Sequence, residues 1–223
     1  MAILGFALFG SRARNEGDAA SDTDLLALTT DRKPTFAVRN GVALSSFPYG
    51  LMLHRAGLGD LFVLHVNTEA TVLYQSAASP VFKTIKDTFR YKDNYFREIG
   101  LPSDVGWFLL RFGDRLRSAK LLNSRMAWVT RTVLIAKAAA QQQPTFGARQ
   151  LAEFSGSPDV LTLIRNRTSS ERDPAMTEKF AAFIRTHGAR EPRMPVNLEE
   201  QKQFFLAERN IAGLRLVERL LQH

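Results

Sequence analysis

The stretch FGSRARNEGDAASDTDLLAL, residues 9–28, decides the fold, because a strand, a glycine turn, an acidic pair and a second strand follow one another. The run before it, residues 3–9, is apolar and predicts a strand buried on both faces. Gly10 then lets the backbone turn sharply and approach a ligand closely. Asp22 and Asp24 stand two apart at the entry to the second strand, so their side chains are expected to point the same way.

The residues around Gly10 suit phosphate. Ser11 offers a hydroxyl and a backbone N–H, and a helix beginning there would add positive potential. Arg12 and Arg14 would add charge-assisted contacts. Carboxylates opposite such a cradle make a site for Mg²⁺. Two such ions about 4 Å apart can bridge a triphosphate, an attacking oxygen and a leaving group.

This stretch resembles the signature of minimal nucleotidyltransferases of the DNA polymerase β superfamily, G-S-x10-D-x-D. Here Gly10-Ser11 is followed by ten residues and then by Asp22, Thr23 and Asp24. The resemblance implies transfer of an NMP group from an NTP, such as ATP, to an acceptor. It also implies that Asp22 and Asp24 are the catalytic metal ligands for Mg²⁺ or Mn²⁺, and that Gly10 and Ser11 hold the β and γ phosphates. Residues 61–74, LFVLHVNTEATVLY, resemble the segment that closes such heads.

One departure from the family concerns its usual third carboxylate. Family members place that acid on the next core strand, where it supports a second metal and helps to activate the acceptor hydroxyl. The candidate strand here, residues 42–47 (VALSSF), has Ala43 or Ser45 at that place. The nearest later acids, Asp60 and Glu69, are expected in surface turns, Glu69 on a solvated rim between strands. The protein therefore uses substrate oxygens or another acid, or reacts slowly, or binds a nucleotide without turnover.

The whole chain predicts an α+β protein, with a small mixed-sheet nucleotidyltransferase head over residues 1–78 and an all-helical bundle over residues 79–223. The boundary is placed in the Ser-, Ala- and Pro-rich residues 75–80. Asn40-Gly41 predicts a hairpin turn. Further elements expected in the head are strands at 24–28, 35–38 and 42–47, a helix at 48–56, and apolar runs at 61–66 and 71–74.

The bundle is predicted from apolar residues at helical spacing. Such stripes cover residues 83–99, 105–121 and 124–140. Asp173-Pro174 is a helix start signal, and Asn197 with Glu200 resembles a capping box that begins a helix running to Leu221.

Composition narrows the function classes. The 223 residues are 45% hydrophobic and carry a formal net charge of +8, which favours polyanionic partners such as nucleotides, nucleic acid or an acidic protein. The absence of cysteine excludes disulfides, thiolate zinc sites and a cysteine nucleophile. No apolar run reaches 18 residues, so no membrane span is expected, and the short N-terminal apolar stretch does not resemble a signal peptide. A cytoplasmic protein fits these features.

The other polar residues match no further catalytic pattern. His54, His65, His187 and His223 form no zinc-hydrolase pattern, and His65 is interpreted as a core or rim histidine. The Arg-x4–6-His pattern of the RNases that pair with such heads is absent, and so is the P-loop pattern. A basic-aromatic cluster around residues 90–97 is interpreted as helix core beside a charged face.

Arg165 and Arg167 are accessory candidates, because they would reach the base or phosphate if they faced the site. The acceptor stays open between a small molecule, a protein side chain and a nucleic acid 3′ end. The alternative function is a nucleotidyltransferase-like binding module that acts through nucleic-acid or protein contact, including a cognate-partner role.

Overall fold

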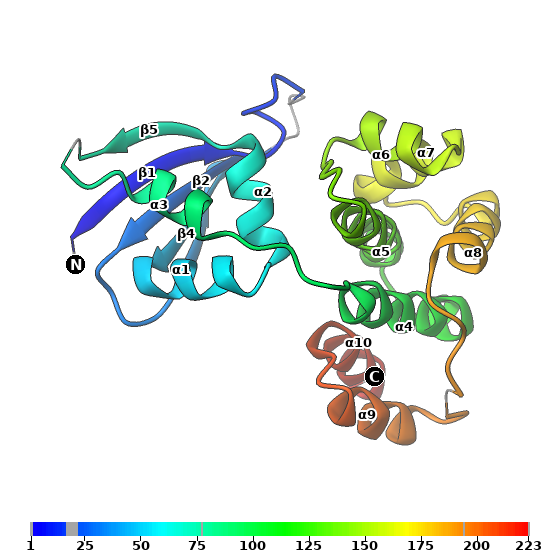
Figure 1. Ribbon diagram of the computed structural model, residues 1–223. Helices are drawn as coiled ribbons and strands as arrows, with labels where there is room; N and C mark the ends of the chain where they lie inside the picture. Colours follow the sequence, from blue (N-terminus) through cyan, green and yellow to red (C-terminus); the bar gives the residue numbers. More distant parts are fainter. Residues whose placement is uncertain (1, 17–21, 77, 194, 223) are drawn as a thin grey trace. The chain divides into compact units, whose positions relative to one another are not determined.

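The computed structural model describes residues 2–16, 22–76, 78–193 and 195–222. The chain forms two compact units, one of residues 1–93 with 139–147 and the other of residues 94–138 with 148–223. The first unit holds a five-stranded mixed sheet with helices, and the second is helical (Figure 1). The predicted α+β class is therefore confirmed.

The sheet has the strand order β3-β4-β2-β1-β5 (Figure 1). Its strands are β1 (Ile3–Phe9), β2 (Thr23–Thr29), β3 (Thr35–Arg39), β4 (Val42–Pro48) and β5 (Thr71–Gln75). Strands β2 and β4 run parallel, and the other neighbouring pairs are antiparallel. The acidic strand β2 therefore lies in the middle of the sheet, between β1 and β4.

The predicted hairpin is present between β3 and β4. Asn40 and Gly41 have φ values of 51° and 72°, the left-handed pair that a two-residue type I′ turn requires. The N–H of Thr23 donates to the carbonyl oxygen of Gly41 at 2.7 Å. This bond ties the hairpin turn to the first residue of β2.

Helices α1 (Tyr49–Gly57), α2 (Leu61–Glu69) and α3 (Val81–Thr88) lie wholly in the first unit. Their apolar residues, including Met52, Val63 and Ile85, form one buried cluster with Ala7 and Leu26 of the sheet. Helix α1 agrees with the helical spacing of residues 48–56.

Helix α2 corrects the expectation of strands on either side of Glu69. The Asp60 carboxylate accepts the backbone N–H groups of Phe62 and Val63, so it caps a helix at the start of the apolar run. Asp60 also pairs with Arg55 at 2.9 Å. This residue is therefore a helix cap, and Glu69 is the last residue of the helix.

The second unit is built from helices around one apolar core. Its elements are α4 (Phe96–Phe112), η1 (Gly113–Arg115), α5 (Ala119–Ala140, whose last two residues belong to the first unit), α6 (Ala148–Ser155), α7 (Pro158–Arg165), η2 (Asn166–Thr168), α8 (Pro174–His187), α9 (Leu198–Ala207) and α10 (Ile211–Leu221). Two predicted starts are confirmed, because Asp173 accepts the N–H of Ala175 and Asn197 accepts that of Glu200, both at 2.8 Å.

Three predicted helices are wrong in extent, because a long-range backbone bond interrupts the first and capping residues interrupt the other two. Residues 83–99 form α3 and then α4, since the N–H of Arg90 leaves the helix to bond Ala56 of α1. Within residues 105–121 the helix α4 ends at Phe112, and Ser118 caps α5 by accepting the N–H of Leu121. The last helix is divided where Arg209 takes a φ of 54° and Asn210 caps α10.

No helix in the described part of the chain is long and apolar enough to cross a membrane.

Candidate metal and nucleotide site

The two halves of the motif meet at one end of the β1–β2 pair. Phe9, the last residue of β1, pairs with Asp24 of β2, and Gly10 follows with a φ of 77°. A Cβ atom added at Gly10 would lie 2.5 Å from Asp24 Oδ2. Glycine is needed here for two separate reasons, the left-handed backbone and the close carboxylate.

The segment after Gly10 is a series of tight turns. The N–H of Arg14 donates to the carbonyl of Gly10 at 3.3 Å, and that of Glu16 to the carbonyl of Ser11 at 2.9 Å. No helix begins at Ser11, because residues 11–15 form turns. Residues 17–21 of the motif lie outside the described residues.

The two aspartates differ in exposure. Asp22 is exposed and directly precedes β2, whereas Asp24 is half-buried within the strand. Alternation along β2 puts Asp24 on the same face as Leu26, the face that the helices cover. Mg²⁺ in proteins is commonly held by one or two carboxylates together with substrate phosphates and water. Asp22 and Asp24 therefore suit one Mg²⁺ ion.

Strand β4 places no carboxylate beside Asp24, as the sequence predicts. In the parallel register Ala43 lies beside Asp24 and Ser45 beside Leu26, and no residue of β4 is acidic. Over residues 2–16, 22–76, 78–193 and 195–222, no three His, Asp or Glu side chains are grouped so that they could hold a metal ion. The second ion of a two-metal site would therefore lack a protein ligand on β4.

Glu69 joins the turn after β1 to helix α2. Its carboxylate accepts from an Arg14 guanidinium N–H and lies 2.6 Å from His65 Nε2. The side chains of Glu69 and Arg14 are only 7% and 13% exposed. The expected solvated rim position of Glu69 is therefore wrong, because the helix end turns the carboxylate inward onto a cation.

His65 is enclosed by aromatic rings. Phe9 meets it edge-on at 5.6 Å between ring centroids, and Phe146 stacks on it at 4.3 Å. This environment agrees with the interpretation of His65 as a core or rim residue. His65 and Glu69 have the i, i+4 spacing of neighbours on a helix. This spacing is the signal in the sequence that could have predicted their contact, had residues 61–69 been recognised as a helix.

The remaining candidate residues are placed as follows. Arg12 is exposed in the turn after β1, and the Arg14 guanidinium also pairs with Glu16 at 2.9 Å. Arg165 ends α7 and Arg167 lies in η2, both in the second unit. Their roles at a nucleotide stay predictions.

Comparison with models of protein families found no match, and comparison with curated proteins found none either. Among solved structures, the chain is similar to the crystal structure of a nucleotidyltransferase-like protein from Exiguobacterium sibiricum. The two chains share 14% sequence identity, with 95% of this chain and 83% of that chain covered and a TM-score of 0.37. At this score the likeness carries no argument about activity, so the function is argued from the residues of the site.

Proposed function

We propose that the first unit binds an NTP through Gly10 and Ser11, with Mg²⁺ held by Asp22 and Asp24, and transfers its NMP group to an acceptor. The observation that carries this proposal is the contact geometry of Gly10 and Asp24. A glycine turn that suits phosphate and a carboxylate that suits a metal ion, placed at opposite ends of one short motif, come together at one point.

The reaction is a substitution at the α phosphorus. An acceptor oxygen forms a bond to that phosphorus, the bond to the bridging oxygen of the β phosphate breaks, and pyrophosphate leaves with the electron pair. The acceptor proton passes to solvent. A metal ion bound at the aspartates supplies charge neutralisation for the triphosphate. Backbone N–H groups of the turn after Gly10 would orient the β and γ phosphates.

One observation favours a second function, nucleotide binding without turnover. Ala43 stands beside Asp24 where the family has its third acid, and the nearby Glu69 is already bound to Arg14 and His65. Strand β4 then offers the acceptor hydroxyl no carboxylate to take its proton. A nucleotide-dependent binding module would need only the metal–triphosphate contacts.

One experiment separates these functions. The protein is incubated with Mg²⁺, cell lysate and each NTP labelled at the α phosphorus, and with the same NTPs labelled at the γ phosphorus. Nucleotidyl transfer moves only the α label to an acceptor. The Asp22→Asn/Asp24→Asn variant abolishes that transfer, and Asp93→Asn, an exposed aspartate of the same unit, is the matched control.

The binding of Mg²⁺ and NTP, measured by calorimetry, completes the test. Binding without any α-label transfer supports the module and contradicts the enzyme. Wild-type protein that neither binds nor transfers overturns both proposals. Transfer that survives in the Asp22→Asn/Asp24→Asn variant overturns the assignment of the aspartates.

A further inference from the structure

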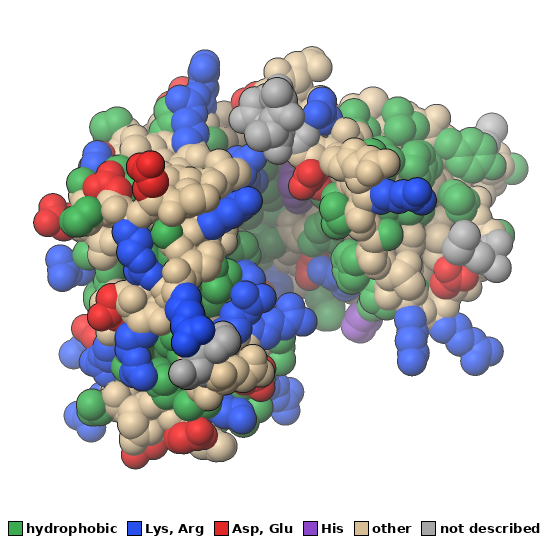
Figure 2. Space-filling model, turned by 180° about the vertical axis from the view of Figure 1, so that it is seen from behind, with side chains coloured by type: hydrophobic (Ala, Val, Ile, Leu, Met, Phe, Trp, Pro, Cys, Tyr) green, Lys and Arg blue, Asp and Glu red, His purple; other side chains and the backbone are tan. Residues whose placement is uncertain are grey.

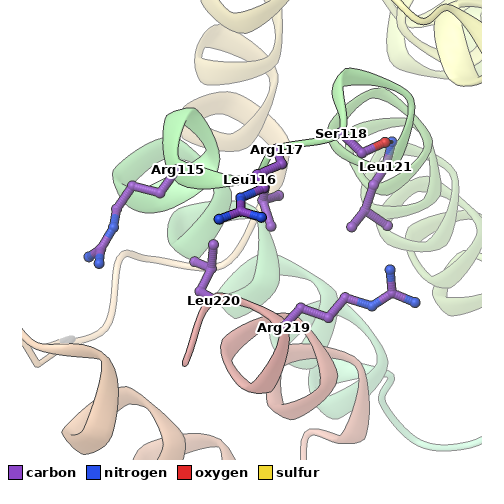
Figure 3. Close-up of a pocket in the computed structure, with 7 residues that line it drawn as sticks. All are labelled: Arg115, Leu116, Arg117, Ser118, Leu121, Arg219 and Leu220. Carbon is purple, nitrogen blue, oxygen red and sulfur yellow. Dashed lines mark hydrogen bonds between the residues drawn. The ribbon is translucent and has the colours of Figure 1, made fainter. Parts of the chain in front are cut away.

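Two pockets of the second unit are lined by arginines and share one of them. The first, about 290 Å³, is lined by Arg115, Arg117 and Arg219 with three leucines and Ser118 (Figure 3). The second, about 280 Å³, is lined by Arg125, Arg215 and Arg219 with Leu216, Glu218 and Gln222. Arg219 therefore belongs to both pockets.

The arginines come from parts of the chain about a hundred residues apart. Arg117 lies in the loop before α5, whereas Arg219 and Leu220 come from α10 (Figure 3). Arg125 lies on α5 and Arg215 on α10. The fold of the helical unit therefore assembles this basic cluster, and the local sequence does not.

The arginines of the second pocket form no ion pair within the described residues. Among the described residues, no salt bridge joins Arg125, Arg215 or Arg219 to a carboxylate, although Glu218 lines one pocket. The Nε of Arg125 is buried and has no hydrogen-bond partner within the described part of the chain. Burial and then the charges of Arg219 and Arg215 lower the pKa of Arg125. The repulsion among these arginines destabilises the protein without a ligand. A bound anion would relieve that repulsion.

Two further features suit an anion. The Ser118 hydroxyl caps the N-terminus of the long helix α5, whose dipole adds positive potential at the first pocket. The second unit also holds two thirds of the 30 Lys and Arg residues, and Lys and Arg side chains are spread over the face of it that Figure 2 shows.

We propose that these two pockets bind neighbouring phosphate groups of a nucleic-acid strand, with Arg219 between them. One guanidinium group can donate two parallel hydrogen bonds to two oxygens of a phosphate group. Arg115, Arg117, Arg215 and Arg219 are all exposed, so a chain passing over the surface reaches them, whereas a small ligand usually takes an enclosed and mostly apolar cavity. Neither pocket has an aromatic residue in its lining, so the strand is held by its backbone without stacking on its bases.

The proposal is independent of the nucleotidyl transfer proposed for the first unit. Its test therefore uses no Mg²⁺ and no NTP, and it is run on the full chain and on Asp22→Asn/Asp24→Asn. The probes are fluorescein-labelled oligo(dT) and oligo(U) of about 16 nucleotides, followed by anisotropy over a range of salt concentrations. Both proteins are expected to bind equally.

The charge-reversal variant is Arg215→Glu/Arg219→Glu, which changes two exposed residues. It is expected to lose affinity at least about 10-fold. The slope of log K against log salt should become less negative by about 1.4, as two lost phosphate contacts require. The matched control, Arg149→Glu/Arg185→Glu, makes the same charge change at exposed residues of the same unit outside both pockets.

Three outcomes would overturn the proposal. Wild-type protein fails to bind either strand at low salt, or the control variant loses as much affinity as the pocket variant. The third outcome is displacement of the oligonucleotide by tripolyphosphate at the same total concentration of phosphate groups. That result would assign the pockets to a small polyphosphate. Circular dichroism of both variants confirms that each is folded before binding is compared.

Discussion

Arg14 and Arg55 of the first unit lie against the carboxylates of Glu69 and Asp60, whereas the pocket arginines of the second unit have Glu218 alone among them. The first arrangement is balanced within the protein and holds a turn and a helix in place. The second leaves positive charge for a ligand to neutralise. Arg14 and Arg55 therefore stabilise the first unit, whereas the pocket arginines suit the anionic ligand proposed above.

The sharpest test of the first unit is Gly10→Ala. The added Cβ meets Asp24 Oδ2 at 2.5 Å on a backbone with a φ of 77°, so we expect loss of detectable Mg²⁺–NTP binding. The strain also lowers the free energy of unfolding by about 1–3 kcal/mol. Gly41→Ala is the matched control, because Gly41 has a φ of 72° but no atom within 4 Å of an added Cβ. Equal NTP affinity in the two variants would contradict the proposed role of Gly10.

The next largest effect is expected for Glu69→Gln. It leaves Arg14 and His65 without their shared anion, which costs about 1–3 kcal/mol of unfolding free energy by denaturant titration. Because Arg14 follows the glycine turn directly, the KM for NTP should rise more than kcat falls. Glu16→Gln, which removes the more exposed partner of Arg14, should change both values less. A pure loss of kcat would instead indicate a chemical role for Glu69.

A third prediction concerns pH in the second unit. Burial, and then the charge of Glu208, raise the pKa of Asp104 from 3.8 to about 6. The folded state thus binds this proton more tightly than the unfolded state does. The contribution to stability is full below pH 3.8 and is lost as the pH rises through about 6.

Asp104→Asn removes this dependence. The unfolding free energy of the variant should exceed that of the wild type at pH 8 by about 1 kcal/mol, after allowance for solvent screening of a partly exposed group, with the gap closing towards pH 4. Thermal unfolding at several pH values measures this gap. A gap that is constant with pH would mean that Asp104 titrates normally in the folded protein.

The smallest expected effect is the change in stability on removing Arg219 from the arginine cluster of the second unit. Arg219→Gln removes one member of the unbalanced cluster, so it should raise the unfolding free energy by about 0.5 kcal/mol at low salt. The gain should shrink as salt screens the remaining charges. Destabilisation by this substitution would mean that Arg219 makes a favourable contact in the free protein.

The features that the sequence predicted are those determined by neighbouring residues. Gly10 and Asp24 belong to one short motif, and Asn40-Gly41 specifies its turn locally. Residues 61–66 were assigned wrongly, because a short apolar run fits a strand or a helix equally and the Asp60 cap decides between them. The contact between Glu69 and Arg14 was missed for the same reason.

The arginine pockets were beyond prediction for a different reason. Arg117 and Arg219 stand about a hundred residues apart, and only the packing of α10 beside the start of α5 brings them to one pocket. Each residue alone resembles an ordinary solvated arginine. The same limit applies to the helix breaks at Gly113 and Arg209, where capping by Ser118 and Asn210 outweighs a continuous apolar stripe.

The bond from Thr23 to Gly41 has a consequence for the order of folding. The β3–β4 hairpin closes through contacts only a few residues apart, so it can form within microseconds, before β2 has found its place. Its turn then presents a carbonyl that receives the first residue of β2 and fixes which residue of β2 faces Ala43. The β3–β4 hairpin, which contains no residue of the candidate metal site, thus helps to set the register of Asp24 together with strand β1. Slowing closure of that hairpin, as Gly41→Ala would, should delay the appearance of metal binding during refolding without changing its final strength.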